Sequence, residues 1–453
     1  MKNLGFGVPL TPIYAKTIHR TVARVLAGLC VLAMAALCTA PARAQVSERE
    51  GQPQMVAQRP TATYTVLYSF VGSPGDGAAP WEIGGALVRD ASGNLFASTA
   101  QGGIAFCQGV QSQWGTVIEL SGSTDTLLFN FADQDCGGTV GIAPSGALAR
   151  DSSGNIFGTT QDGGPSGGGN VFELSAGGVF TVLHSFASGD GENPYSGVIL
   201  DRQGNIYGTT PLGALGYGTV YEINNQGAFS VLYTFTGGAD GGKPYGGLAM
   251  DLLGNLYGMT YVGGASQDGV VFELSRSGGG WTETVLHTFT GSSNDGQNPR
   301  FASLTLQSTG PLTQIYGVTE LGGSNGAGTA FSLTKTRTGY NFKLLHSFTR
   351  TNGDGGLPRG TLLLRNGKLY GTTAAGGSSG DWGTVFQLAP GPTPLGGWQE
   401  TILYNFTGGA DGGTPIAGLV ADSTGALYGA TRDAGIVNSS CAYGCGVIFK
   451  VQP

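Results

Sequence analysis

Apolar residues between Tyr64 and the C-terminus come in short runs of five to seven, and each run is bounded by Gly, Asn, Asp or Pro. The runs are rich in Val, Leu, Ile, Thr, Tyr and Phe, which is typical of β-strands. No part of this region has apolar residues spaced three and four apart, as an amphipathic helix would require. In the clearest copy the runs lie within residues 246–260, 269–275 and 284–289. The pattern therefore predicts an all-β protein.

The same set of runs recurs seven times along the chain. The second run of each set carries an aromatic residue, the third begins with a glycine, and the fourth ends in phenylalanine. Repeats of about 50 to 60 residues indicate propellers, solenoids or arrays. The markers are the aromatics Phe96, Phe157, Tyr207, Tyr257, Tyr316, Tyr370 and Tyr428, the glycines Gly115, Gly169, Gly218, Gly269, Gly328, Gly383 and Gly446, and the phenylalanines Phe70, Phe131, Phe186, Phe235, Phe289, Phe348 and Phe406.

Each unit is predicted to be a four-stranded antiparallel meander. DxxGN segments such as 201–205 join the first two strands, with Asp and Asn as turn formers and Gly supplying a positive φ. Such units can stack into a solenoid or close into a ring. The run 65–70 precedes the first unit, whereas the last unit ends at 446–451 without a fourth strand. We therefore expect a seven-bladed β-propeller of four-stranded antiparallel blades over residues 63–453, closed by its N-terminal strand so that no sheet edge stays open.

Glycine supplies 83 of the 453 residues, a share that by itself would suggest disorder. The glycines recur at fixed turn positions between apolar runs, so they indicate tight loops in a packed structure. Length alone would suggest several domains, but a ring of repeats forms one.

Residues 1–44 have the pattern of a secretory signal peptide. Basic residues precede an apolar run from 25 to 37 that is too short for a comfortable membrane span, and small residues suit cleavage after Ala44. Residues 45–62 would then form a polar leader that we expect to be flexible. We expect the mature protein to be exported to the periplasm or the cell exterior, without a membrane span.

The predicted mature chain is acidic. Removal of the signal peptide leaves 17 basic and 29 acidic residues, a net charge of −12. An acidic protein is repelled by the phosphates of nucleic acids, so we do not expect a nucleic-acid partner.

Four cysteines remain after cleavage, and an oxidising compartment favours their pairing. Three connectivities are possible, and proximity along the chain favours Cys107 with Cys136 and Cys441 with Cys445. A zinc site is the alternative, but no histidine lies near these cysteines. We expect all four in loops on one face of the first and last blades, where they would staple the seam of the ring.

The segments GGLAMDLLGNLYGMT, GTVYEI and TVLHTFTGSSNDGQNP resemble the Gloeo/Verruco repeat of tandem-repeat exported bacterial proteins. They are similar, more loosely, to the GLAVDxxGNLYVAD pattern of NHL-type propeller blades. The likeness covers residues 64–451. It implies a repeat fold and export, and it carries no established catalytic residues.

A residue needed once for catalysis should break the repeat. His184, His287 and His346 instead share one position of the fourth strand, where other copies carry Tyr or Phe. We interpret them as packing residues. We therefore expect neither a histidine acid–base pair nor a histidine metal site.

Six Asp-Gly pairs lie four residues before a proline and would connect the outer strand of one blade to the inner strand of the next. Such a turn uses Asp to bond nearby backbone, Gly for left-handed backbone and Pro to direct the chain into the strand. The carboxylates could alternatively hold Ca²⁺, but no loop has the dense alternation of acids found in dedicated calcium loops, so no cofactor is expected. The aspartates are Asp76, Asp190, Asp240, Asp295, Asp354 and Asp411.

The residue after each proline varies and is predicted to surround the mouth of the central channel. Aromatic and arginine side chains around a concavity suit stacking on sugars or binding of an anionic group, and plain filling of the channel is the alternative. Other departures from the repeat are predicted on the same face. The candidate ligand-binding residues are Trp81, Glu82, Trp114, Tyr195, Tyr245, Arg300, Arg359, Trp382, Arg432 and Asp433.

The leading hypothesis is a noncatalytic, monomeric propeller that binds a glycan, or a protein of the cell envelope or exterior, at this face. One alternative is a carbohydrate-active lyase or hydrolase using carboxylates such as Glu82 and Asp433 with Arg300 or Arg432. Another is a purely structural envelope protein. Under the leading hypothesis the chain has no catalytic residues.

Overall fold

The computed structural model describes residues 62–72, 77–78, 87–107, 110–131, 138–309, 312–393, 397–438 and 441–453, of which 77–78, 104–107, 110–113, 309 and 312 are described by their backbone alone. The predicted signal peptide and all but the last residue of the predicted leader lie outside these ranges. The regular elements of the described part are β-strands. Nowhere in it does a helix occur that is long and apolar enough to cross a bilayer.

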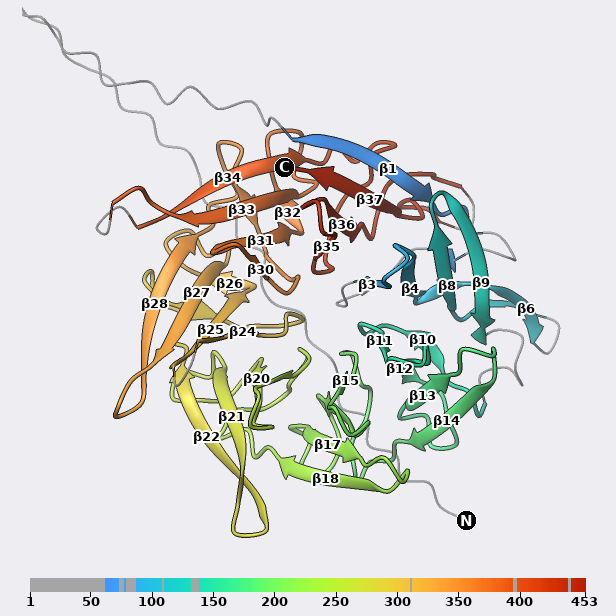
Figure 1. Ribbon diagram of the computed structural model, residues 1–453, viewed down its shortest axis with the longest axis horizontal. Coiled ribbons are helices and arrows are strands. Elements are labelled where there is room, and N and C mark those ends of the chain that lie inside the picture. Colours follow the sequence, from blue (N-terminus) through green and yellow to red (C-terminus); the bar gives the residue numbers. More distant parts are fainter. Residues whose placement is uncertain are drawn as a thin grey trace, which may run out of the picture. The chain divides into compact units, whose positions relative to one another are not determined.

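Seven sheets of antiparallel strands form the blades of a propeller, which confirms the predicted fold (Figure 1). Each blade runs from an inner strand near the centre of the ring to an outer strand at its periphery. We number the blades along the chain. Blade 1 contains β3 (Val88–Arg89), β4 (Leu95–Thr99), β8 (Thr116–Ser121) and β9 (Thr124–Asn130); blade 2 contains β10 (Ile142–Pro144) and β11 (Ala149–Arg150), which both pair with β12 (Ile156–Asp162), then β13 (Asn170–Leu174) and β14 (Phe180–Ser185); blade 3 contains β15 (Ile199–Leu200), β16 (Ile206–Thr210), β17 (Thr219–Ile223) and β18 (Phe229–Thr234).

The remaining four blades repeat this order. Blade 4 contains β19 (Ala249–Met250), β20 (Leu256–Thr260), β21 (Val270–Ser277) and β22 (Gly280–Thr288); blade 5 contains β24 (Thr305–Thr309), β25 (Leu312–Thr319), β27 (Thr329–Lys335) and β28 (Tyr340–Ser347); blade 6 contains β30 (Leu363–Arg365), β31 (Lys368–Thr373), β33 (Thr384–Pro390) and β34 (Trp398–Asn405); blade 7 contains β35 (Val420–Ala421), β36 (Leu427–Ala430), β37 (Val447–Gln452) and β1 (Thr63–Ser69).

Blade 7 is completed by the N-terminal strand, as the sequence predicts. β1 pairs antiparallel with β37 along its whole length, and the sheet order is β1-β37-β36-β35. Beyond the strand, the backbone N–H of Phe70 donates to the carbonyl of Gly446 at 3.2 Å. The outer strand of this blade therefore comes from the opposite end of the described chain, and the ring closes without an unpaired edge at the seam.

Short two-stranded pieces connect the loops on one face. Three of them pair the turn that enters a blade with the loop after that blade's second strand, and the fourth is a hairpin within the insertion of blade 1. The pairs are β2 (Gly77–Ala78) with β5 (Gln101–Gly102), β23 (Gly296–Gln297) with β26 (Leu321–Gly322), β29 (Gly355–Gly356) with β32 (Ala375–Gly376), and β6 (Ile104–Cys107) with β7 (Val110–Gln113).

The repeated residues form the packing both within a blade and between neighbouring blades. A Cβ on Gly258 of β20 would lie 2.5 Å from Cζ of Phe272 in β21, so glycine at this position leaves room for the ring of the neighbouring strand. Phe289, just after β22, packs edge-on against Phe331 of the next blade with ring centroids 5.4 Å apart. The phenylalanines at the ends of the outer strands are all at most 1% exposed: Phe70, Phe131, Phe186, Phe235, Phe289, Phe348 and Phe406.

The turns between blades carry backbone strain at the residue before the proline. The φ of Thr414 is 53° and that of Leu357 is 55°, values that non-glycine residues rarely adopt. The N–H of each donates to a carbonyl of the preceding blade, Thr414 to Trp382 at 2.8 Å and Leu357 to Ala327 at 2.7 Å. The sequence predicts the left-handed backbone at the glycine of each Asp-Gly pair. Gly191, Gly241 and Gly412 have a positive φ, but Gly296 and Gly355 do not; the left-handed position that these turns share is the residue before the proline. The residues concerned are Ala143, Asn193, Lys243, Asn298, Leu357 and Thr414.

Candidate functional site

In four of the turns between blades, the residues that directly follow the proline converge near the centre of the ring. These prolines are Pro194, Pro244, Pro299 and Pro358. Tyr195 and Tyr245 lead into blades 3 and 4, and Arg300 and Arg359 lead into blades 5 and 6. The ring centroids of both tyrosines lie 6.3 Å from that of Phe301. The guanidinium carbons of the two arginines lie 4.6 and 5.9 Å from the same ring. Four positions from four blades therefore form one continuous surface.

A second set of side chains meets the first. It comes from the position that follows a threonine at or near the end of the second strand of each blade. Gln161 Nε2 donates to the hydroxyl of Tyr195 at 2.7 Å, and the ring of Tyr261 lies edge-on to Tyr245 with centroids 5.6 Å apart. In blade 5 this position is Glu320, which binds an arginine of the first set. We call the combined surface the axial rim; it consists of Gln161, Tyr195, Tyr245, Tyr261, Arg300, Phe301, Glu320 and Arg359.

Four members of the axial rim were not predicted, although the sequence contains a signal for each. The position of Phe301 carries Gly, Ser or Ala in blades 2, 3, 4, 6 and 7, so this phenylalanine breaks the repeat. The position after the second-strand threonine also varies from blade to blade. Its occupants are Ala100, Gln161, Pro211, Tyr261, Glu320, Ala374 and Arg432.

Arg300 is the cation of the rim that lacks an acidic partner in the described part of the chain. Its guanidinium carbon lies 5.6 Å from the ring of Tyr245 and 5.8 Å from that of Tyr261. Its Nε is buried and has no hydrogen-bond acceptor among the described residues. Stacking on rings holds the side chain but leaves a buried donor unsatisfied, which is costly unless a further group accepts from it. The arrangement is suited to an anionic ligand.

Arg359 differs because its charge is already compensated. Its Nη2 lies 2.5 Å and its Nε 3.0 Å from Oε1 of Glu320. Both side chains are largely buried, with 18% and 10% of their area exposed. This ion pair fixes one side of the rim next to Arg300 without adding net charge.

A cavity of about 250 Å³ lies where the lead-in segments of blades 2 to 6 approach one another, and Phe301 belongs both to its wall and to the axial rim. Its walls include Ser196, Gly247, Phe301 and Thr361. Neighbouring segments touch, since a Cβ on Gly197 would lie 1.7 Å from a carbonyl oxygen of the adjacent blade. The cavity can accept a small group, but a larger ligand would have to remain at the rim.

Two of the predicted tryptophans pack away from the axial rim. Trp382, just before β33, lies over the turn that enters blade 7, where a Cβ on Gly408 would lie 2.1 Å from its ring. Trp114 has the equivalent position before β8 and packs on the core between blades 1 and 2.

Arg432 and Asp433 pair with each other, with Nη2 of the arginine 2.7 Å from Oδ2 of the aspartate. Asp433 is 6% exposed. Trp81 and Glu82 lie outside the described residues.

The disulfide Cys441–Cys445 is present, as predicted, with Cα atoms 5.2 Å apart. Both residues are buried in the core that also contains Phe70 at the seam. They belong to one loop, however, so the bond constrains that loop and does not itself join the two chain ends. Cys107 ends strand β6 instead of lying in a loop, and Cys136 lies outside the described residues.

The histidines lie at junctions between the outer strands of adjacent blades. The ring of His184 stacks on Phe229 of the next blade with centroids 3.6 Å apart, and its Nε2 lies 3.0 Å from Oδ2 of Asp190 in the following turn. His287 stacks on Phe342 in the same way. These contacts confirm the predicted packing role, and burial lowers the pKa of His184.

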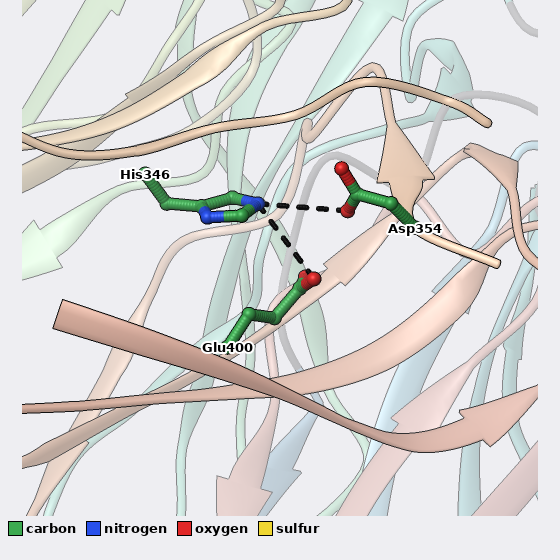
Figure 2. Close-up of side chains that lie close together, drawn as sticks. All are labelled: His346, Asp354 and Glu400. Atoms are coloured by element: carbon green, nitrogen blue, oxygen red, sulfur yellow. Dashed lines mark ion pairs between the residues drawn. The ribbon is translucent and has the colours of Figure 1, made fainter. Parts of the chain in front are cut away.

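The junction at His346 has a carboxylate in place of the aromatic partner. Figure 2 shows Nε2 of His346 between Asp354 and Glu400, 3.5 and 3.7 Å from their nearer oxygens. Burial and then the charge of Asp354 raise the pKa of Glu400 to about 9. Glu283 has the equivalent position in blade 4, where burial and then Asp240 raise its pKa to about 7.

Comparisons with known proteins identify the repeat. The family model of the Gloeobacter/Verrucomicrobia repeat matches residues 104–313 and again residues 254–453. No curated protein matches the sequence significantly.

Solved structures are similar to this chain at low identity. A Bacteroides uniformis protein provisionally named 6-phosphogluconolactonase is 13% identical with a TM-score of 0.48, covering 77% of this chain and 89% of its own. The extracellular domain of a provisionally named one-component system of Bacteroides thetaiotaomicron is 11% identical with a TM-score of 0.47, covering 85% of this chain and 39% of its own. At these values neither structure bears on the activity of this chain.

Proposed function

The chain belongs to the Gloeobacter/Verrucomicrobia repeat family, and we propose a function from the axial rim: exported, noncatalytic binding of an acidic glycan. The observation that carries the proposal is Arg300, a cation held on three aromatic rings with a buried donor left unsatisfied in the described part of the chain. The carboxylate of a uronic acid would accept from this guanidinium, and the aromatic rings would pack against sugar rings.

The rim offers little for catalysis. Glycoside cleavage by acid–base chemistry requires two carboxyl groups around one bond. The described rim contains one, Glu320, and it is bound to Arg359. Asp433, an alternative candidate, is buried and paired with Arg432. Binding without turnover is therefore favoured over a hydrolase.

The test compares binding of a galacturonate trisaccharide and a neutral trisaccharide by calorimetry. We expect the acidic sugar to bind and Arg300→Gln to weaken it at least about tenfold, since a hydrogen bond to a charged group contributes about 1.5–3 kcal/mol. Arg350→Gln is the matched control, because Arg350 pairs with Asp381 away from the rim. Equal binding by Arg300→Gln, or a preference for the neutral sugar, would contradict the proposal.

Two further outcomes separate the alternatives. Release of shorter products from the bound glycan would indicate an enzyme. Capture of a protein partner that depends on Arg300, with no glycan binding, would indicate a protein-binding rim.

Export is supported by the signal-like N-terminus and by the disulfide Cys441–Cys445. N-terminal sequencing of the protein from periplasmic and culture fractions should begin at Gln45. An intact N-terminus in the cytoplasmic fraction would contradict export.

A further inference from the structure

Four junctions between outer strands share one contact, and the junction of blades 5 and 6 departs from it in a way that suggests a ligand. The ring near the end of an outer strand meets the residue four positions before the equivalent ring in the next blade. Four junctions place two rings face to face, with centroids 3.6 to 4.2 Å apart. These pairs are Phe129–Phe180, His184–Phe229, His287–Phe342 and Tyr404–Tyr64.

At the junction of blades 5 and 6 the ring is His346 and its partner is Glu400. The aspartate of the following turn is also farther from the ring. Nε2 of His184 lies 3.0 Å from Asp190, whereas Nε2 of His346 lies 3.5 Å from Oδ1 of Asp354. The ring has thus lost its aromatic stack, and its Nε2 lies 3.5 Å from Asp354 and 3.7 Å from Glu400, longer than the 3.0 Å at His184.

Two unsatisfied atoms of this junction face one another, since Nε2 of His346 lies 3.5 Å from Oδ1 of Asp354; the oxygen of Glu400 nearest the ring, at 3.7 Å, is Oε2. Nε2 of His346, Oδ1 of Asp354 and Oε1 of Glu400 are buried and have no hydrogen-bond partner in the described structure. One ligand atom from each residue can be chosen so that all lie within 4.8 Å of one another, and within the described ranges this is the one group of three or more such residues. A buried ring nitrogen and a buried carboxylate oxygen that face each other without a hydrogen bond, beside a second carboxylate, are costly unless a further species lies between them.

The geometry and charge fit a divalent cation. Ligands about 2.1 Å from a tetrahedral zinc ion lie about 3.4 Å from one another, close to the 3.5 and 3.7 Å observed. Two carboxylates balance a charge of +2, and the imidazole favours a transition metal over Ca²⁺ or Mg²⁺, which prefer oxygen.

The side chains are held in place by rigid supports. His346 lies on β28 and Glu400 on β34. The second oxygen of Asp354 accepts from the backbone N–H and the hydroxyl of Thr349 at 2.7 and 2.8 Å, which leaves Oδ1 directed at the junction. Such outer hydrogen bonds orient metal ligands.

We propose that His346, Asp354 and Glu400 bind a zinc-class divalent metal ion that joins the outer strands of blades 5 and 6. The ion takes the place of the aromatic stack present at four other junctions. Three protein ligands leave a fourth position for water. This proposal departs from the expectation that no histidine metal site exists, and it does not depend on the function of the axial rim.

The test uses the protein purified without a histidine tag, stripped with a chelator, and dialysed against zinc. We expect one zinc ion per chain at this site and a zinc-dependent rise in the thermal midpoint. Glu400→Gln should lower zinc affinity at least about tenfold and abolish that rise. Glu283→Gln is the matched control, since Glu283 has the same position at the blade 3–4 junction beside a tyrosine.

Glu400→Phe is a second variant, which tests whether loss of zinc binding is caused by misfolding. It restores the aromatic partner found at four other junctions, so it should fold and bind no zinc at this site. Wild-type protein that retains no zinc, or Glu400→Gln that retains as much as wild type, would overturn the proposal. The cluster would then be a histidine–carboxylate ion pair without a metal.

Discussion

Tyr64 of the closing strand stacks on Tyr404 of blade 6, with ring centroids 3.8 Å apart and ring planes within 10° of parallel. Its hydroxyl donates to the backbone carbonyl of Asp411 at 2.5 Å. The strand that closes the ring is therefore held by side chains as well as by its ladder with β37. Burial, and then Tyr404 and Asp411, raise the pKa of Tyr64, so the hydroxyl stays a donor at physiological pH.

Tyr64→Ala should lower the free energy of unfolding by about 2–4 kcal/mol, because it removes a buried aromatic stack and a hydrogen bond. Urea denaturation measures the change. Tyr443→Ala is the control within blade 7, since Tyr443 is 74% exposed and should alter stability little. Equal stability of the two variants would show that the closing strand contributes nothing through Tyr64.

Glu283→Phe should stabilise the protein. It replaces a half-buried carboxylate, one oxygen of which has no hydrogen-bond partner among the described residues, with the aromatic found at four sister junctions. The new ring would stack on Tyr233. A thermal midpoint below that of wild type would indicate that this junction cannot accept a ring.

Glu283 also predicts a pH dependence. Its pKa is raised from 4.5 to about 7 in the folded protein, so the folded state binds this proton more tightly than the unfolded state. Stability should therefore fall as pH rises from 4.5 to about 7, and the contribution of this group should be level above that range. Allowing for solvent screening, the change is about 1–2 kcal/mol. Glu283→Gln should remove this part of the dependence, as measured by urea denaturation at pH 5 and pH 8; parallel curves for both proteins would contradict it.

Gly258→Ala should destabilise blade 4 by about 2–3 kcal/mol, because the added Cβ would lie 2.5 Å from the ring of Phe272. Gly280→Ala in the same blade is the control, since a Cβ there meets nothing within 4 Å. Thermal unfolding of both variants is the measurement. A similar midpoint for the two would mean that the Phe272 ring can move aside.

Thr414→Asn should raise the free energy of unfolding by about 0.5–1 kcal/mol, because asparagine tolerates a positive φ better than a β-branched residue. Blades 3 and 5 already carry Asn193 and Asn298 at this position. Chemical denaturation is again suitable. Loss of stability would mean that the threonine side chain makes a contact worth more than the strain.

Sequence reasoning succeeded where a property depends on residues that repeat. The turn role of Asp240 and the packing role of His184 each recur in several blades, so the repeat itself reveals them. Gly258 differs, because it lies within strand β20 beside Phe272 and not at a turn. The sequence did not predict the surroundings of His346, because this histidine occupies the same repeat position as His184 and His287. The difference lies in Glu400, more than fifty positions away, whose approach depends on how two blades pack.

In the axial rim, too, the contacts between blades could not be predicted from the repeat. Arg300 and Arg359 occupy equivalent positions and are chemically alike, yet Glu320 neutralises one and leaves the other beside aromatic rings.

The amino-acid sequence by itself determined the strands, the number of blades, the closure of the ring and the face on which variable residues gather, because these follow from local periodicity and turn chemistry that repeat along the chain. Only the tertiary structure decided which variable side chains touch. Those contacts join residues from adjacent blades, and their distances and burial depend on the packing of whole sheets, which no single repeat encodes.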